Sequence, residues 1–137
     1  MDFNLDVVSA RVCPYCNKPP EYVDSSIIYG KSYGMIYLCK ECDAYVGTHK
    51  TSKKSLGRLA DRELREDKKR AHFYFDQLWK KAVDCGRSKR EARTSGYRWL
   101  SDQLGVPEKF THIGMFDKEL CDKVVNLCRP YCLMVYE

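Results

Sequence analysis

Four cysteines stand in two pairs whose spacing is typical of a metal site. Cys13 and Cys16 form one C-x2-C pair, Cys39 and Cys42 form the other, and 22 residues separate the pairs. Zn²⁺ prefers four tetrahedral ligands, and a C-x2-C turn brings two thiolates to one ion with little strain. Four thiolates leave no open position for water on the ion. The pattern therefore predicts one Zn²⁺ per chain that holds the fold and performs no chemistry.

Disulfides or free buried thiols are the alternative interpretation of these four residues. The sequence begins Met-Asp-Phe-Asn-Leu-Asp, with two acids and no basic segment, which is unlike a signal peptide. The longest purely apolar runs are only a few residues, too short to cross a membrane. We therefore expect a cytoplasmic protein, whose thiols stay reduced and available to a metal.

A second group of residues could do chemistry if folding brought its members together: Asp43, His49, Arg65, His72 and Asp76. His72 and Asp76 are four residues apart, so on a helix the carboxylate could orient the imidazole, as in a metal-dependent nuclease. The simpler interpretation is that these groups tie a long helix to the cysteine-rich region by hydrogen bonds. No P-loop, GxSxG or HExxH motif occurs. We assign no catalytic residue, and the sequence favours a non-enzymatic role.

The remaining cysteines allow a second metal site as one interpretation. Cys121, Cys128 and Cys132 could form it together with His112. Cys121 and Cys128 fall on the apolar stripe of a predicted helix, where small buried thiols are the commoner finding. We apply the same interpretation to Cys132 and Cys85.

Short β-strands are predicted around the two cysteine pairs. Residues 21–23, 27–29, 35–38 and 44–46 have strand-like composition, and 30–34 is a glycine-bounded turn. Two or three antiparallel strands held together by two cysteine turns make a zinc ribbon. The run 51–54 is polar and basic, and we place the boundary of the ribbon there.

Three helices are predicted after the ribbon, beginning near residue 59, after Ser88 and at Asp117. Asp61 is a possible N-cap of the first, and the charged run 65–70 is predicted to be its solvated face. Gly96 lies inside the second helix, where glycine costs about 1 kcal/mol relative to alanine, which indicates close packing at that point. The third helix is expected to end at Arg129-Pro130.

The predicted fold class is α+β: a small four-cysteine zinc ribbon packed with a three-helix C-terminal extension. The chain has 137 residues and a mass of 16.0 kDa. A chain of this length is long enough for a ribbon over residues 1–50 and a helical extension over residues 51–137. We expect the two parts to form one cooperative unit. The net charge is +5, but residues 50–98 hold 16 basic and 7 acidic groups. This basic centre between acidic flanks predicts an anionic partner.

Several short motifs occur together in a known family. They are Cys13-Pro14-Tyr15-Cys16, the run 42–47 with His49 after it, Phe75-Asp76-Gln77-Leu78-Trp79, and the run 112–117. With them the chain resembles the phage and prophage family of zinc-finger-containing domains of unknown function. The resemblance implies a zinc ribbon with a helical extension, and it implies no particular activity.

Nucleic acid is the anionic partner that the sequence favours. Phosphate contacts from lysine and arginine carry most of the non-specific affinity, and exposed tyrosines can stack on bases. The candidate contact residues lie in the hairpin loop and the connector: Lys31, Tyr33, Lys50, Lys53, Lys54 and Arg58. The alternative is a phage factor that binds a host protein, such as a host enzyme or defence system, with an exposed segment 110–116 as part of its contact surface.

Overall fold

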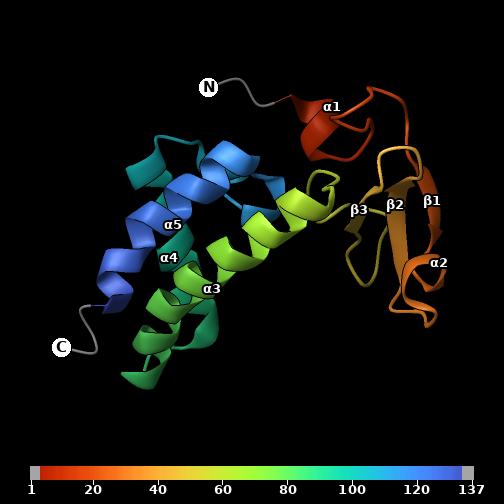
Figure 1. Ribbon diagram of the computed structural model, residues 1–137. Coiled ribbons are helices and arrows are strands. Elements are labelled where there is room, and N and C mark those ends of the chain that lie inside the picture. The colour runs from red at the N-terminus through yellow and green to blue at the C-terminus, as the bar shows by residue number, and fades with distance from the viewer. Residues whose placement is uncertain (1–3, 134–137) are drawn as a thin grey trace. The chain divides into compact units, whose positions relative to one another are not determined.

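The computed structural model describes residues 4–133, and their fold is α+β (Figure 1). The chain divides into two compact units. One ends at Arg65 and the other begins at Glu66. We call them the ribbon unit and the helical unit. No helix in the described part of the chain is both long and apolar enough to cross a membrane.

The ribbon unit contains a three-stranded antiparallel sheet, as the sequence predicts. Its strands are β1 (Glu21–Asp24), β2 (Met35–Cys39) and β3 (Ala44–Gly47), in the order β1-β2-β3. Tyr22 faces Tyr37, and Cys39 faces Ala44 next to the turn that joins β2 to β3. The second cysteine pair therefore lies at one end of the sheet. The other end carries the loop that precedes β2 and the chain that follows β3.

Residues 27–29 form a helical turn, and the predicted strand at this position is wrong. The turn is α2 (Ser26–Tyr29), and its C-cap Gly30 has the left-handed φ of 72°. The Asp24 carboxylate accepts a hydrogen bond from the backbone N–H of Ser26 at 2.8 Å and one from the Ser32 hydroxyl at 2.8 Å. Such an Asx contact favours a turn, and it ends β1 before the apolar pair Ile27-Ile28. Both isoleucines are exposed as a result.

The chain after β3 doubles back along that strand. Thr48 forms an isolated antiparallel β-bridge with Ser55, and Tyr45 forms another with Ala60. Between them, the N–H of Leu56 donates a hydrogen bond to the carbonyl of Gly47 at 2.9 Å. The returning segment covers an edge that would otherwise offer unpaired backbone groups. The predicted boundary at 51–54 lies at the tip of this turn, and the expectation of one cooperative unit stays a prediction.

Helix α3 (Arg62–Asp84) begins where the sequence indicates. The Asp61 carboxylate accepts a hydrogen bond from the backbone N–H of Leu64 at 2.9 Å, which is an N-cap contact. The charged run that follows is not uniformly solvated, because the Asp67 side chain is only 3% exposed and lies 3.0 Å from Arg70 and 3.2 Å from Lys118. A carboxylate at this depth requires partner cations, so the prediction of a solvated face is wrong at this residue.

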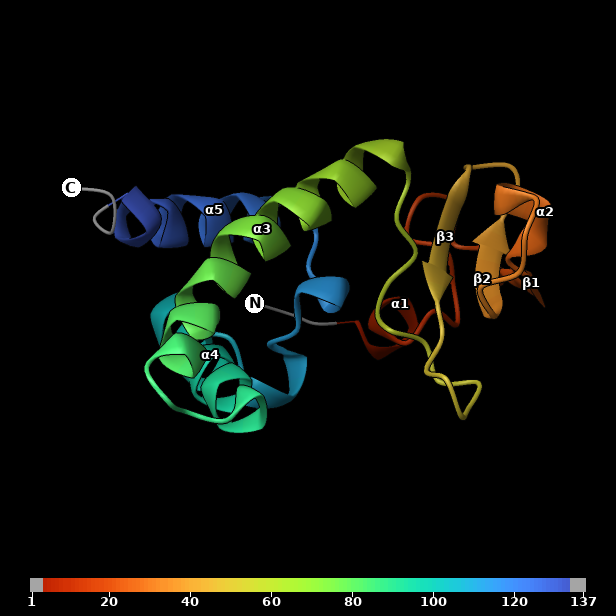
Figure 2. The same ribbon diagram turned by 90° about the horizontal axis from the view of Figure 1, so that it is seen from below.

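Three long helices make up most of the helical unit (Figure 2). They are α3, α4 (Lys89–Leu104) and α5 (Lys118–Leu133), with the short turns η1 (Glu108–Phe110) and η2 (Ile113–Met115) between α4 and α5. Helix α5 runs parallel to α3, since Lys118 reaches Asp67 and Lys81 reaches the carbonyl of Tyr131. Helix α4 crosses α3 at Gly96, where an added Cβ would lie 3.2 Å from Cζ of Phe75. The close packing predicted at this glycine is confirmed.

Helix α5 continues through Pro130, and the predicted end at Arg129-Pro130 is wrong. Proline removes one backbone hydrogen bond. Beyond it, the Cys132 thiol is buried and donates to the carbonyl of Tyr74 at 3.3 Å, and the Tyr131 carbonyl accepts from Lys81. Tertiary contacts therefore hold the last turn in helical form.

Two further predictions about exposure are wrong. The segment 110–116 was expected to be an exposed contact surface, but Thr111, Ile113 and Phe116 are completely buried in it. Cys85 was expected to be a buried thiol, but it is exposed in the turn after α3. Cys121 and Cys128 are fully buried on α5, as predicted.

Candidate functional site

The first cysteine pair lies in a tight turn that precedes β1. The N–H of Cys13 donates to the carbonyl of Lys18 at 2.8 Å, and the N–H of Asn17 donates to the carbonyl of Cys13 at 2.8 Å. These bonds close a loop around Cys16. Asn17 completes the turn with a φ of 62°, a left-handed conformation in which asparagine is enriched.

The second cysteine pair also lies in a turn, which joins β2 to β3. Cys39 ends β2, Cys42 lies in the turn, and Asp43 follows it with a φ of 50°. The N–H of Asp43 donates to the carbonyl of Lys40. Each C-x2-C pair is thus followed at once by an Asn or Asp in the left-handed region. The sequence contains this signal at residues 17 and 43, and our sequence interpretation did not use it.

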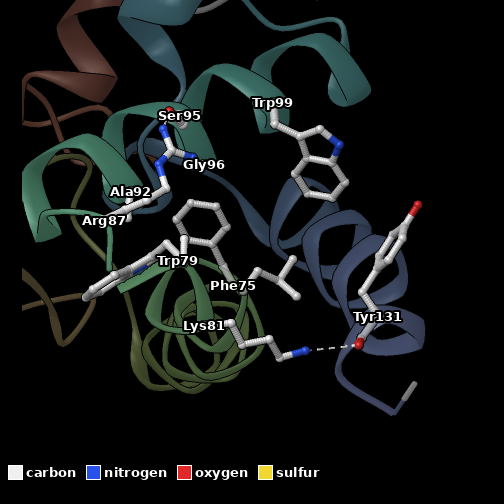
Figure 3. Close-up of a pocket in the computed structure, with 11 residues that line it drawn as sticks. Phe75, Trp79, Lys81, Arg87, Ala92, Ser95, Gly96, Trp99 and Tyr131 are labelled. Atoms are coloured by element: carbon white, nitrogen blue, oxygen red, sulfur yellow. Dashed lines mark hydrogen bonds between the residues drawn. The ribbon is translucent and has the colours of Figure 1, made fainter. Parts of the chain in front are cut away.

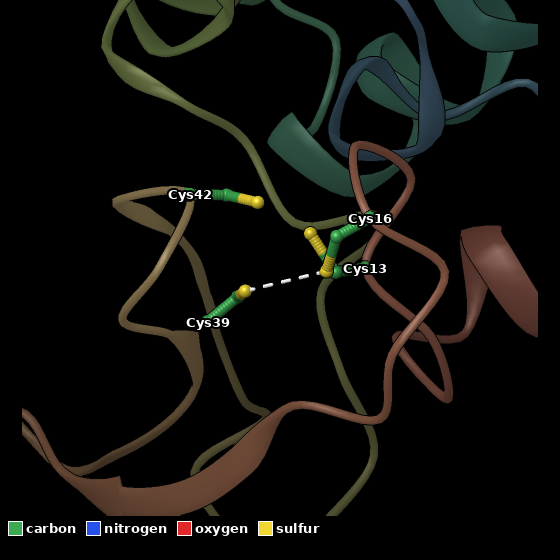
Figure 4. Close-up of side chains that lie close together, drawn as sticks. All are labelled: Cys13, Cys16, Cys39 and Cys42. Atoms are coloured by element: carbon green, nitrogen blue, oxygen red, sulfur yellow. Dashed lines mark hydrogen bonds between the residues drawn. The ribbon is translucent and has the colours of Figure 1, made fainter.

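The four thiol groups converge on one point (Figure 4). Their sulfur atoms all lie within 4.8 Å of one another, and Sγ of Cys16 is 3.7 Å from Sγ of Cys39. Zn–S bonds of about 2.3 Å in a tetrahedron place the sulfurs about 3.8 Å apart. A disulfide would need about 2.05 Å. The arrangement therefore fits one structural Zn²⁺ held by Cys13, Cys16, Cys39 and Cys42.

Burial and backbone donors act differently on the individual thiols. Burial raises the pKa of Cys42 to about 12 and also raises the pKa of Cys13. A hydrogen bond from the backbone of Lys18 lowers the pKa of Cys16. Cysteine binds zinc as the thiolate, so metal binding releases protons and weakens as the pH falls. The metal thereby stabilises thiolates that burial disfavours.

The cysteine site is also the core of the ribbon unit. Its buried apolar neighbours are few and mostly small: Ala10, Ala44, Val46 and Leu59, with Tyr37 partly buried against them. Even with further buried residues such as Ile36 and Leu38, the core is small for a unit of some sixty residues. We therefore expect the ribbon unit to depend on the metal for its fold.

Asn17 offers a test of the turn geometry. Asn17→Gly is expected to leave zinc affinity nearly unchanged, since glycine adopts positive φ without cost. Asn17→Val is expected to weaken it by about 1–2 kcal/mol, because a β-branched residue is strained in this conformation. Competition with a chromophoric chelator measures both variants. Equal zinc affinities for the two variants would contradict the assigned role of the backbone conformation.

Both cysteine turns contact the beginning of α3. The backbone N–H of Asp61 donates to the Tyr15 hydroxyl at 3.1 Å, and Tyr15 lies inside the first turn. Arg65 donates to the carbonyl of Asp43, in the second turn, at 3.0 Å and to the carbonyl of Ala60 at 2.8 Å. The first turn of α3 is therefore fixed from both halves of the metal site.

The structure brings together only part of the predicted polar cluster. Arg65 meets Asp43, with their side chains 3.7 Å apart. His72 instead contacts the carbonyl of Lys68 through Nδ1 at 2.9 Å, and Asp76 accepts from Nε1 of Trp79 at 2.8 Å. The predicted pairing of His72 with Asp76 does not form, and each group has a helical partner of its own.

Across residues 4–133, the four zinc cysteines are the only group of three or more His, Cys, Asp or Glu residues close enough to hold a metal. Cys128 and Cys132 are buried, and burial is the main reason that their thiol pKa values are raised. His112 lies beside Tyr97, with the ring centroids 5.2 Å apart and the ring planes tilted by 55°. The predicted second metal site is therefore not formed among the described residues.

The predicted nucleic-acid residues lie mainly in two loops of the ribbon unit. Lys31 and Tyr33 lie in the loop 30–34, with the Lys31 ammonium 5.9 Å from the Tyr33 ring centre. Lys50, Lys53 and Lys54 are exposed in the turn 48–55. Arg58 is half-buried on the returning segment and has interactions of its own.

A row of tyrosines extends from the first of these loops. The Tyr29 ring lies between Tyr33, at 5.6 Å, and Tyr45, at 6.1 Å, and both contacts are edge-on. The Arg65 guanidinium lies 4.2 Å from the Tyr45 ring centre. Neither Tyr29 nor Tyr45 is among the binding residues predicted from the sequence. Their adjacency depends on the helical turn α2, which the sequence did not predict.

The helical unit has an apolar groove of about 500 Å³ between its long helices (Figure 3). Phe75, Trp79 and Trp99 form its aromatic walls. Its two basic side chains have protein partners: Lys81 donates to the carbonyl of Tyr131, and Arg87 donates to Ser95 at 2.9 Å. The groove therefore offers aromatic surface rather than a free charge.

Comparison with known protein families matches most of the chain. A family model described as a zinc-finger-containing domain matches residues 9–131, a range that includes both cysteine pairs and most of the helical unit. Searches of curated proteins and of solved structures each gave no match.

Proposed function

The chain belongs to the family of zinc-finger-containing domains, and from that premise we propose that its ribbon unit binds nucleic acid. In this proposal zinc holds the binding loops in place and takes no part in chemistry. The protein acts without enzymatic activity in the cytoplasm of a phage-infected or prophage-carrying host cell, in keeping with the family resemblance.

The observation that carries the proposal is the placement of the two basic loops. Strands β2 and β3 are antiparallel, so the loop before Met35 and the turn after Gly47 lie at the same end of the sheet, away from the cysteines (Figure 1). The Thr48 hydroxyl donates a hydrogen bond to the carbonyl of Met35 at 2.9 Å and so connects the end of the first loop to the beginning of the second. The segment 48–58 contains four cations and no carboxylate. Such a surface suits phosphate contacts.

The tyrosine row supplies a second kind of contact. The Tyr33 side chain is 73% exposed and Tyr29 is 53% exposed, and cations flank the row at Lys31 and Arg65. Unpaired bases stack on such rings, and each stacked base contributes about 1–3 kcal/mol. Single-stranded nucleic acid is therefore the favoured form of the ligand.

The two alternatives have less support. Binding to a host protein through residues 110–116 required that segment to be exposed, but Ile113 and Phe116 are completely buried in it. A metal-dependent nuclease required His72 and Asp76 to act together, and each has another partner. We therefore propose neither role.

Charge reversal in the turn 48–55 tests the proposal. The variant with Lys50, Lys53 and Lys54 replaced by Glu is expected to bind a labelled single-stranded oligonucleotide much more weakly. Each lost phosphate contact lowers the slope of log affinity against log salt by about 0.7, so the slope should fall by about 2. Fluorescence anisotropy at several salt concentrations measures both quantities.

The matched control reverses three exposed cations on the helices: Lys69, Lys123 and Arg129. Lys118 is left intact because it pairs with buried Asp67. If both triple variants lost the same affinity, or if the unmodified protein did not bind at low salt, the proposal would be wrong.

Substitutions of Tyr33 distinguish the contribution of stacking to binding from that of charge. Tyr33→Ala is expected to weaken binding to single strands by about 1–3 kcal/mol, whereas Tyr33→Phe keeps the ring and is expected to bind almost normally. Anisotropy titrations of both variants with the same oligonucleotide measure the difference. A loss of affinity equal in the two variants would assign the effect to the hydroxyl and contradict stacking.

A further inference from the structure

A second basic surface lies in the helical unit, where it lines a cavity of about 750 Å³. One wall is a face of α4, on which Lys89, Arg93 and Tyr97 follow one another at intervals of four residues. The rest of the lining comes from η1 and the residues after it, including Lys109 and His112. All of these elements belong to the helical unit, so the cavity is complete within it.

The charge of the lining is strongly positive. Lys89, Arg90, Arg93 and Lys109 contribute four cations, and Glu108 is the single carboxylate among the lining residues. That carboxylate lies 3.3 Å from Nε of Arg98, which offsets its charge. Arginine and lysine side chains in a concave site are suited to a phosphate group, because arginine can donate two parallel hydrogen bonds and lysine adds a compact charge.

The cavity also has an aromatic part. Tyr97 lies with its ring centre 5.2 Å from that of His112 and 4.7 Å from that of Phe75, which is fully buried. A tyrosine phenol is uncharged at neutral pH, and burial raises the pKa of Tyr97 further. This neutral ring packs against buried Phe75, lines the cavity and offers aromatic surface to a planar group.

We propose that this cavity binds a nucleoside monophosphate unit, with its phosphate among the cations of α4 and η1 and its base against Tyr97 and His112. The volume lies within the range of about 300–1,000 Å³ that is usual for small-ligand sites. The unit is either a free mononucleotide or the terminal nucleotide of a nucleic acid strand. The proposal does not rest on binding by the ribbon unit.

Isothermal titration of the full-length, zinc-loaded protein with AMP and with inorganic phosphate provides the test. AMP is expected to bind at least about tenfold more tightly than phosphate, because stacking adds to the charge contacts. The variant Arg90→Gln/Lys109→Gln is expected to bind AMP about tenfold more weakly. Arg93 is left intact, because it also lies over the Trp79 ring at 5.7 Å.

The matched control is Lys123→Gln/Arg129→Gln, which removes the same charge from exposed positions of α5 and is expected to bind AMP as the unmodified protein does. The ribbon variant with Lys50, Lys53 and Lys54 reversed should also keep its affinity for AMP. Failure of nucleic-acid binding by the ribbon unit is thereby distinguished from failure of this site.

A competition experiment identifies the source of the nucleotide. A 5′-phosphorylated oligonucleotide that displaces AMP, while its 5′-hydroxyl counterpart does not, would support a strand terminus. Binding of AMP without such displacement would support a free nucleotide. Absence of AMP binding together with no preference for a 5′-phosphate would overturn the proposal, as would equal losses in the pocket and control variants. If inorganic phosphate bound as tightly as AMP, the proposed stacking of the base against Tyr97 and His112 would be wrong.

Discussion

Cys39→Ser is expected to abolish zinc binding and to unfold the ribbon unit. Cys39 lies 3.7 Å from Cys16 across the site and also ends β2, so its loss removes a metal ligand beside the central strand. Structural zinc in small domains contributes about 10–16 kcal/mol of apparent binding free energy, which is folding free energy. The small apolar core around the site cannot replace it.

Elemental analysis and circular dichroism together measure this effect. The variant should contain no zinc, against one per chain in the unmodified protein, and retention of its helical signal would show that the two units unfold separately. Cys85→Ser is the matched control, because Cys85 is exposed and outside the site. Retention of one zinc by Cys39→Ser would contradict the four-cysteine assignment. Loss of the helical signal as well would favour the single cooperative unit expected from the sequence.

Phe75→Ala is expected to destabilise the helical unit by about 3–5 kcal/mol, the usual cost of removing a buried aromatic side chain. Its ring is fully buried, packs against Tyr97 and fills the space left by Gly96. Urea unfolding followed by helical circular dichroism measures the change in the free energy of unfolding.

Phe73→Ala is the matched control for Phe75→Ala. It removes the same side chain from the same helix, but at a position that is 62% exposed. A small effect is expected there. Equal losses of stability in the two variants would show that the core of the helical unit does not depend on Phe75.

The features predicted correctly from the sequence are those fixed by local chemistry. The cysteine spacing identified the metal ligands because four thiolates at these intervals have few other uses. Asp61 was identified as an N-cap because its carboxylate satisfies a donor three residues away. Gly96 was identified as a packing point because glycine inside a helix carries a cost that needs compensation.

The features that were missed depend on tertiary context. Ile27 and Ile28 have strand propensity, but the hydrogen bonds of Asp24 and the left-handed Gly30 turn this segment into α2. Pro130 usually stops a helix, but the packing of Cys132 extends α5 beyond it. The basic cavity joins side chains of α4 to Lys109, and no local pattern reveals that junction.

The contacts of Tyr15 with Asp61 and of Asp43 with Arg65 have a consequence for how the chain folds during synthesis. All four metal ligands leave the ribosome before residue 61, so the cysteine turns are available before α3 is complete. The costly step in making a helix is its first turn, which fixes several dihedral angles for a single hydrogen bond. A metal-bound ribbon presents two fixed hydrogen-bonding partners to that turn. We therefore expect zinc bound to the nascent chain to lower the barrier to nucleating its longest helix.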